Sequence, residues 1–551
     1  MPFFQRFGRK DANLDSHCRD DDQARAVYNE RVSHMRKLEY HMLKGLTYLD
    51  HGGTTLAPRS LLNSFCSEMQ RTLLANPHSD ASNPSATAIM VESVRLEVLK
   101  MFQADPEHFD VVFTANATAA IKLVAEGFSG LEEGFDYFYH RNSHTSLVGV
   151  RELACSNHCF TSNVEVVDWL ADSVRATDVP QRPILFAYPA QSNMNGERLP
   201  LDWAKKLRLS ANHERAYTLL DVAALVSTSP LDLSDHSAAP DFTALSFYKI
   251  FGFPDLGALI VRKAAGHIFD QRRYFGGGTT EMTTCTGDVW VARKDSSLHA
   301  RLEDGTIAFR SILALKFAIA THRELFGGPG QVSKHTSWLA RNLYERLAGS
   351  NHLNGMPMYR IYKAADSKYH DPKTQGATIA FNVCRSNGSY TGPWHVGCFL
   401  RRHDIHIRTG TVCNPAGMAC ALGLNSEWLR KAFEKGYRCN TEQDVVEQIP
   451  VGVVRVTFGA MSTLEDVEKL VSSLSELISE EESHLQSEKR ASAENRNSTM
   501  DFAERTPVTE GLQSRTETDD SQGNTPVKRN FIAVRNRSHR LTRLLHVCLG
   551  S

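Results

Sequence analysis

Apolar and polar segments alternate between about residues 85 and 265 in a way that predicts a layered α/β domain. Short apolar runs, typical of buried strands, are separated there by segments with helical periodicity. This alternation favours a mostly parallel sheet covered by helices. Ligands of such sheets bind at the carboxyl ends of the strands, so polar residues at those ends are the first candidates for chemistry.

The pattern changes after about residue 335. The runs "ATIAFNVCRS" and "VGVVRVTFGAMS" predict strands of a smaller α+β unit. The segment "STLEDVEKLVSSLSELISE" predicts a helix, which a capping box of Thr463 and Asp466 would start. One face of this helix is apolar and comprises Leu464, Val467, Leu470, Val471, Leu474 and Ile478.

These patterns predict four segments along the chain. The first segment is dominated by a predicted helix over residues 21–45. At the other end of the chain only nine of the fifty residues 481–530 are apolar, so we expect a disordered tail there. The expected segments are an N-terminal helical segment that packs on the small domain (1–45), a large domain (46–334), a small α+β domain (335–480) and the tail (481–551).

Composition narrows the class of protein. Its 551 residues include 62 Lys and Arg against 63 Asp and Glu, which gives no electrostatic case for nucleic acid or an anionic membrane. No apolar run reaches about 18 residues, and the first residues become charged too early for a secretory signal. Eleven cysteines without a repeating frame indicate free thiols, so we expect a cytoplasmic protein.

Lys249 stands in the apolar run "FTALSFYKIFG", which we expect to be a strand. A lysine is rarely buried unless it is paired, and burial lowers its pKa and makes the amine a nucleophile. The alternative is a lysine at a strand end that buries its stem and keeps its ammonium in water.

Asp221 ends the predicted strand "AYTLLD", 28 residues before Lys249. If the two strands are parallel neighbours, both side chains reach one crevice. A lysine that binds an aldehyde, with an acid for a pyridinium nitrogen, is typical of pyridoxal phosphate (PLP) chemistry. Alternatively, Asp221 caps a helix or a turn.

The segment "TANATAA" could bind the phosphate of such a cofactor. It presents Asn116, Ala117 and Thr118 where a strand passes into a helix, and N–H groups at a helix start form an anion site. Ser246, three residues before Lys249, could add a hydroxyl. The alternative for this segment is an ordinary helix cap.

Cys413 is the candidate nucleophile of the loop "RTGTVCNPAG", in which Arg408 also lies. A thiol on a polar loop near positive charge is typical of reactive cysteines, although an exposed free cysteine is the alternative. Cys420 and Cys439 are close enough in sequence to suggest zinc. Their spacing fits no established pattern, and we predict no metal site.

Four motifs together resemble the N-terminal, cysteine-desulfurase-like domain of molybdenum cofactor sulfurases, within the class V branch of PLP enzymes. They are "YLDHGGTTLAP", "SFYKIFGFPDLGALIVR", "YFGGGT" and "RTGTVCNPAG", and the resemblance covers about residues 25–480. It implies the PLP-dependent transferase fold, which is aspartate aminotransferase-like. We recognise no MOSC domain, the C-terminal domain of full-length members, after residue 480.

The resemblance also implies roles around the cofactor. Lys249 would hold the aldehyde and Asp221 would pair with the pyridinium nitrogen. Thr306 would reach the phosphate of a neighbouring subunit, which implies a homodimer. His144 would lie over the cofactor ring, and Asn193 would contact its phenolic oxygen. The phosphate would be bound by Ala117, Thr118 and Ser246.

The implied substrate is L-cysteine, whose carboxylate Arg455 would clamp, with Arg408 close by. Lys249 would move the α-proton and Cys413 would take the sulfur as a persulfide, releasing L-alanine. The sulfur would pass to the molybdenum cofactor or a molybdenum enzyme, such as xanthine dehydrogenase. Two alternatives remain: a general cysteine desulfurase or other class V enzyme, such as a C–S lyase, and a catalytically silent binding protein of this fold.

Overall fold

The structure is a computed structural model that describes residues 10–78, 85–171, 182–210, 213–439 and 441–503. Contacts between residues divide the chain into a first unit, 1–487, and a second, 488–551. The predictions for residues 504–551 lie outside the described residues. Among the described helices, none is long and apolar enough to span a membrane.

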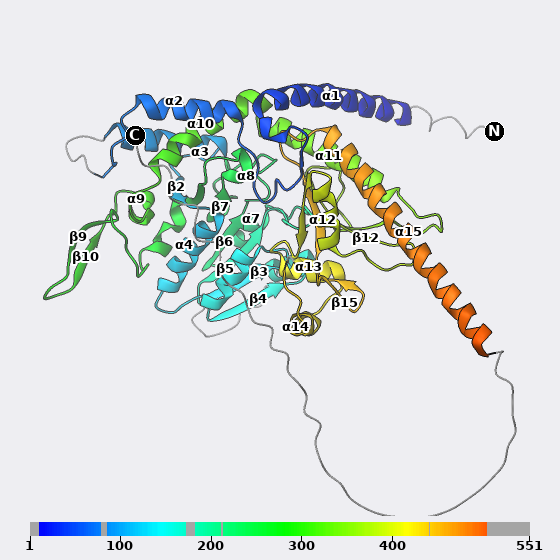
Figure 1. Cartoon of the computed structure of the whole chain (residues 1–551). Helices are drawn as coiled ribbons and strands as arrows, with labels where there is room; N and C mark the ends of the chain where they lie inside the picture. Colours follow the sequence, from blue (N-terminus) through cyan, green and yellow to red (C-terminus); the bar gives the residue numbers. More distant parts are fainter. Residues whose placement is uncertain (1–9, 79–84, 172–181, 211–212, 440, 504–551) are drawn as a thin grey trace, which may run out of the picture. The chain divides into compact units, whose positions relative to one another are not determined.

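A seven-stranded sheet forms the centre of the first unit (Figure 1). Its order is β2-β8-β7-β6-β5-β3-β4, and the five strands from β7 to β4 are parallel to their neighbours. Only β8 pairs antiparallel, with both β2 and β7. The strands are β2 (Phe109–Thr114), β3 (Asp136–His140), β4 (Ser156–Phe160), β5 (Ile184–Pro189), β6 (Ala216–Asp221), β7 (Phe242–Ser246) and β8 (Gly257–Arg262).

Helices cover both faces of this sheet, which explains why its central strands are apolar on both sides. One core packs the sheet against α3 (Ala86–Met101) and α10 (Phe309–Phe326). The other core packs it against α4 (Ala117–Gly130) and a 3₁₀ turn at Lys263–Phe269. The predicted α/β layering with a mostly parallel sheet is confirmed.

The small domain, which also belongs to the first unit, contains a four-stranded antiparallel sheet of order β11-β12-β17-β14. Three helices pack on it through the core that includes Leu339, Leu400 and Leu470. Its elements are β11 (Tyr359–Tyr362), β12 (Thr378–Val383), β14 (Arg408–Gly410), β17 (Val453–Thr457), α11 (Pro329–Ala348), α12 (Pro393–Arg402) and α15 (Leu464–Ala503).

The start of α15 follows the prediction closely. Asp466 accepts a hydrogen bond from the backbone N–H of Thr463 at 2.8 Å, as a capping box requires. The predicted apolar face is buried at Val467, Leu470 and Leu474. The helix continues to Ala503, beyond the position at which the low apolar content led us to place the tail.

The N-terminal helix is longer than expected and ends earlier. We expected a helix over residues 21–45, whereas the observed helix is α1 (Lys10–Glu39). A 3₁₀ turn follows it at His41–Leu43. Arg36 of α1 forms an ion pair with Asp466 at 2.5 Å, and α1 also contacts α11. The segment after α1 then forms β1 (Thr47–Tyr48), which pairs in parallel with β13 (Ile405–His406).

The other elements surround these two sheets. In the large domain they are α2 (Arg59–Arg71), α5 (Thr145–Val148), α6 (Asn163–Ala171), α7 (Trp203–Leu209), α8 (Tyr248–Phe251), α9 (Leu298–Leu302), β9 (Thr280–Thr284) and β10 (Trp290–Arg293), with a 3₁₀ turn at Gly149–Leu153. In the small domain they are α13 (Pro415–Leu422), α14 (Ser426–Glu434), β15 (Val445–Val446) and β16 (Ile449–Pro450).

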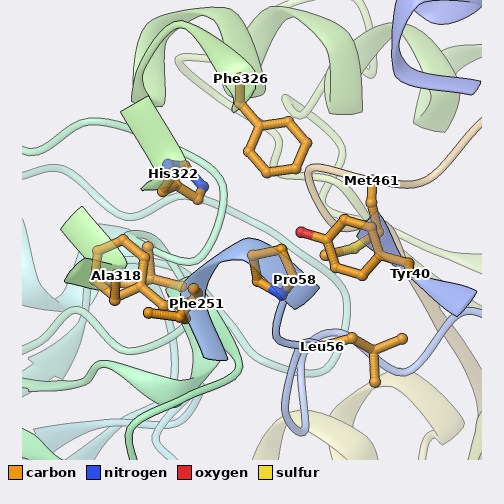
Figure 2. Close-up of a pocket in the computed structure, with 10 residues that line it drawn as sticks. Tyr40, Leu56, Pro58, Phe251, Ala318, His322, Phe326 and Met461 are labelled. Carbon is orange, nitrogen blue, oxygen red and sulfur yellow. The ribbon is translucent and has the colours of Figure 1, made fainter. Parts of the chain in front are cut away.

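A small cavity of about 10 Å³ lies where α8, α10 and the segment after α1 meet. Figure 2 shows Phe251 and His322 on one side of this cavity and Tyr40 and Met461 on the other. Its lining is almost entirely apolar, and Nε2 of His322 is buried there without a hydrogen-bond partner.

Candidate functional site

A larger cavity of about 170 Å³ opens at the carboxyl ends of β5, β6 and β7, where the small domain faces the sheet. Ten of the eleven predicted site residues line it, and Thr306 is the exception. The lining comprises Gly52, Gly53, Ala117, Thr118, His144, Ser146, Pro189, Gln191, Asn193, Asp221, Ala223, Ala224, Ser246, Tyr248, Lys249, Arg408, Val412, Cys413 and Arg455.

Lys249 belongs to α8, a one-turn helix after β7, and not to a strand as we predicted. The strand ends at Ser246, and the chain turns so that the lysine faces the cavity while Ile250 and Phe251 enter the core. Desolvation lowers the pKa of the Lys249 amine below its ordinary value. The carboxylate of Asp221 acts in the opposite direction, because it favours the charged amine.

Asp221 is the last residue of β6, as predicted, and its carboxyl group is buried. One carboxylate oxygen accepts a hydrogen bond from the backbone N–H of Ala223 at 3.0 Å, which fixes its direction at the strand end. Strands β6 and β7 are parallel neighbours, and Asp221 pairs in register with Ala244. The expectation that Asp221 and Lys249 meet at one crevice is therefore confirmed.

The junction of β2 and α4 combines an ordinary cap with a cavity wall. Asn116 caps α4 by accepting from the N–H of Ala119 at 3.0 Å. The N–H of Ala117 donates to Oγ of Ser246 at 2.9 Å, which joins the helix start to the end of β7. Ala117, Thr118 and Ser246 all line the cavity, so the junction presents a helix start and hydroxyl groups to it.

His144 is the N-cap of α5, and its ring lines the cavity. Nδ1 accepts from the N–H of Ser146 at 3.2 Å and lies 2.6 Å from the Ser146 hydroxyl. Because the backbone N–H can only donate, the neutral ring carries its proton on Nε2. Desolvation lowers the pKa of His144, which favours this neutral form.

Cys413 lies in a tight turn formed by residues 411–414, which we call the Cys413 turn. The N–H of Asn414 donates to the carbonyl of Thr411 at 3.1 Å, and both central residues have positive φ, +47° at Val412 and +56° at Cys413. This is the pattern of a type I′ turn, and a β-branched residue such as valine adopts it only under strain. The thiol of Cys413 is half-buried and lines the cavity.

Several hydrogen bonds hold the Cys413 turn against the large domain. The N–H of Thr145 donates to the carbonyl of Cys413 at 3.0 Å. The side-chain amide of Asn193 donates to the carbonyl of Val412 at 2.7 Å. Asn193 also accepts from Nδ2 of Asn414 at 3.0 Å, so this predicted cofactor residue orients the cysteine turn as well.

Arg455 and Arg408 form a cross-strand pair on β17 and β14. Arg455 is 3% exposed, and its Nη2 lies 2.6 Å from Oδ1 of Asp50. Nη1 of Arg455 donates to the carbonyl of Asn193 at 3.0 Å, while Arg408 lies 4.0 Å from the second carboxylate oxygen of Asp50. Burial lowers the pKa of Arg455, and the charge of Asp50 opposes this effect.

Several residues at or beside the cavity were not predicted from the sequence. Gly52 and Gly53 line the cavity from the loop after β1, and Asp50 of the same loop pairs with Arg455. Their signal was the motif "LDHGGTT". A Cβ at Gly52 would lie 3.0 Å from Thr457 and 3.4 Å from Arg455, so a larger residue there would press on both side chains. Gln191 follows β5, where polar residues at the strand end were the available signal.

Thr306 lies outside this cavity, on the exposed loop between α9 and α10. Its hydroxyl accepts from Nδ2 of Asn76 at 3.4 Å. Thr306 is predicted to reach the phosphate site of a neighbouring subunit and not that of its own chain. Its position outside this cavity does not test that role, which stays a prediction.

Solved structures share the fold of this chain. The chain has the fold of a cysteine desulfurase from Thermococcus onnurineus NA1, solved in its apo form, with a TM-score of 0.61. That match covers 81% of this chain and 97% of the other at 19% identity. The predicted PLP-dependent transferase fold is confirmed at the level of the fold.

The family follows from the sequence. The profile of the aminotransferase class-V family matches residues 47–470, and the chain belongs to this family. It is 52% identical over 449 residues to the molybdenum cofactor sulfurase of Aspergillus fumigatus (strain CBS 144.89 / FGSC A1163 / CEA10), covering 81% of this chain and 53% of the relative. It is 48% identical over 463 residues to that of Chaetomium globosum, covering 83% and 59%. The chain thus spans about half the length of the curated relatives it matches.

Proposed function

We propose that this chain is a PLP-dependent sulfurtransferase that takes sulfur from L-cysteine and serves the molybdenum cofactor. The observation that carries the proposal is one cavity lined by Lys249, Asp221 and Cys413. An amine, a buried acid and a thiol at one site suit the removal of sulfur from an amino acid. The relatives at about 50% identity are named molybdenum cofactor sulfurases, which supports the choice of acceptor.

The residues present fit PLP. Lys249 offers an amine for the aldehyde and Asp221 a buried carboxylate for the pyridinium nitrogen. His144 lines the space for the ring, and the hydroxyl groups of Thr118 and Ser246 lie at the start of α4, where a phosphate would bind. When bound, the cofactor supplies an electron sink for the substrate α-carbon.

Lys249 is the group that we assign to proton transfer. Desolvation lowers the pKa of its amine, so a larger fraction is neutral near physiological pH than for an exposed lysine. A neutral amine can accept the α-proton of the substrate at Nζ and return a proton to the product. Asp221 limits this depression of the pKa.

Arg455 is assigned to the substrate carboxylate, with Arg408 beside it. The guanidinium of Arg455 is buried, and its fixed fork suits bidentate recognition of a carboxylate. Its Nε atom has no hydrogen-bond partner and is buried, so it keeps unused donor capacity. An amino acid bound through this arginine would present its side chain to the same cavity that Cys413 lines.

Cys413 is the proposed acceptor of the sulfur. Its sulfur attacks the sulfur of the bound cysteine, the Cβ–S bond of the substrate breaks, and an S–S bond forms. The products are L-alanine and a persulfide on Cys413, and no external oxidant or reductant is needed. The nucleophile must be a free thiol, and the nine cysteines whose side chains the structure describes are free, so we propose a reducing compartment such as the cytosol.

We further propose a homodimer in which Thr306 reaches the phosphate site of the partner. Its exposure, away from the cavity of its own chain, supports this role. A cross-complementation experiment would test it. Inactive Lys249→Ala and Thr306→Ala chains should regain part of the activity when mixed, if each supplies the residue that the other lacks.

The main test supplies PLP and L-cysteine to the full chain and measures alanine, sulfide and the cysteine-bound persulfide. Lys249→Ala should lose the visible absorbance of the bound cofactor and all alanine release. Cys413→Ser should lose the persulfide. Reactivation of desulfo xanthine dehydrogenase then tests the acceptor. Active desulfuration without reactivation would favour a general desulfurase or a C–S lyase, and no cofactor band at all would favour a silent binding protein.

A further inference from the structure

A second thiol lies beside the Cys413 turn. Sγ of Cys439 is 3.6 Å from the hydroxyl oxygen of Thr411, the first residue of this turn. Cys439 follows α14 and is exposed to solvent. The segment that carries it is anchored by Tyr437, whose hydroxyl donates to the carbonyl of Val451 at 3.0 Å and whose N–H donates to that of Ala432 at 3.0 Å.

The closure of the turn sets the separation of the two thiols. The four Cα atoms of a β-turn lie within about 7 Å, so contact with Thr411 places Cys439 Sγ on the order of 10 Å from the sulfur of Cys413. A persulfide extends Cys413 by one S–S bond of about 2 Å. Rotation about the Cα–Cβ bond moves a cysteine sulfur by up to about 3 Å, so rotation at both cysteines is needed to span the remaining gap.

The two thiols differ in access. Cys413 is half-buried at a cavity of about 170 Å³, whereas Cys439 is exposed. The Cys413 turn is held by Thr145 and Asn193, and the side chain of Val412 is buried within it. A turn held in this way keeps its sulfur at the cavity. An acceptor larger than the cavity therefore needs the sulfur at a more exposed atom.

We propose that Cys439 is a relay thiol, which takes the terminal sulfur from Cys413 and presents it at the surface. This inference rests on the proposed function, because it needs a persulfide on Cys413. The Cys439 thiolate attacks the outer sulfur of that persulfide, the S–S bond on Cys413 breaks, and a new S–S bond forms on Cys439. Cys413 leaves as a thiolate, one proton is exchanged with solvent, and no net oxidation or reduction occurs.

The experiment uses the full chain loaded with PLP, L-cysteine as donor and two probe acceptors. Dithiothreitol is small enough to enter the cavity, whereas a thiol-bearing dextran is not. Persulfides are trapped by alkylation and located by peptide mass spectrometry. Cys439→Ser is compared with Cys420→Ser and Cys285→Ser, which change exposed thiols on α13 and between β9 and β10.

The relay predicts persulfide on both Cys413 and Cys439 in the unsubstituted chain and in both controls. Cys439→Ser should accumulate persulfide on Cys413, transfer sulfur to thiol-dextran at least tenfold more slowly, and release alanine to dithiothreitol at the normal rate. Equal transfer to thiol-dextran would overturn the relay. So would a Cys413–Cys439 disulfide formed with release of sulfide.

A different result would overturn the proposed function itself. If neither alanine nor a persulfide on Cys413 forms in the unsubstituted chain, the sulfurtransferase assignment is wrong. If Cys413 carries a persulfide and Cys439 never does, only the relay is wrong. The two failures are thus distinguishable in one set of spectra.

Discussion

Nη2 of Arg455 lies 2.6 Å from Oδ1 of Asp50, so the arginine assigned to the substrate carboxylate already holds a carboxylate of its own chain. The contact depends on the pairing of β1 with β13 and on an isolated β-bridge between Asp50 and Thr457, which together place Asp50 beside β17. Arg455 is almost fully buried, and an unpaired buried charge is costly. Asp50 therefore neutralises Arg455 and would compete with a substrate carboxylate for it.

The first prediction separates these two effects of Asp50. Asp50→Asn keeps an oxygen that can accept from Arg455 but removes the competing charge, so KM for L-cysteine should fall by roughly threefold to tenfold, about 0.7–1.4 kcal/mol. Asp50→Ala removes the anchor, so Arg455 loses its position and KM should rise. Steady-state alanine release gives both values, and kcat should change less than KM. An equal rise of KM in both variants would contradict the competition.

The second prediction concerns the amine of Lys249. The Asp221 carboxylate favours the charged amine, so Asp221→Asn should lower the pKa of Lys249 further. At a pH below that pKa more of the amine is then neutral, and acylation of Lys249 in the cofactor-free chain should be roughly three to ten times faster. Peptide mapping measures this rate, with the exposed Lys122 as internal reference. An unchanged Lys249 rate would show that Asp221 does not influence the amine.

Much of the site was predictable because it depends on the ends of neighbouring strands. The ends of β6 and β7 are marked by Asp221 and Ser246, and parallel pairing brings such ends together. Lys249 was placed in a strand because a short apolar run does not distinguish a strand from a buried helical turn. The roles of His144 and Arg455 came from the family resemblance, and the structure places both at the cavity wall.

What was missed depends on contacts distant in sequence. Asp50 reaches Arg455 only because Thr47 pairs with Ile405, and no local pattern around either residue indicates that pairing. The positive φ angles of Val412 and Cys413 were also hidden, since neither residue type favours that conformation. Pairings and strained turns of this kind are set by tertiary structure, so single-sequence patterns do not reveal them.

The third prediction concerns Gly257, at the start of β8. A Cβ there would lie 2.5 Å from Cα of Asn116 and 2.6 Å from its carbonyl carbon, and backbone atoms cannot move aside cheaply. Gly257→Ala should displace the start of α4, lower the free energy of unfolding by about 1–3 kcal/mol and weaken PLP binding. Gly149→Ala is the control, because a Cβ there meets nothing within 4 Å. Denaturant unfolding measures the free energy of unfolding of both variants, and titration with PLP measures their affinity for the cofactor. Equal values for the two variants would contradict the prediction.

The fourth prediction is an acid sensitivity that originates at the small cavity of Figure 2. Desolvation among apolar side chains lowers the pKa of His322 to about 4 from 6.5. Below pH 6.5 His322 is therefore protonated in the unfolded chain but stays neutral in the folded chain. The free energy of unfolding falls as the pH drops from 6.5 towards 4, and His322 contributes up to about 1.4 kcal/mol per pH unit to this fall. Burial elsewhere in the fold also lowers the pKa of His335 to about 4, which makes the free energy of unfolding depend more steeply on pH.

His322→Leu isolates this contribution. Leucine can pack against Phe251 and Phe326, the rings that contact His322, and it removes the proton-binding group. The free energy of unfolding, measured by denaturant titration at several pH values from 4 to 7.5, should then depend less steeply on pH. His41→Leu, a change at an exposed histidine, is the control and should keep the original slope. Equal slopes in the His322 variant and the unsubstituted chain would show that His322 is not a source of the acid sensitivity.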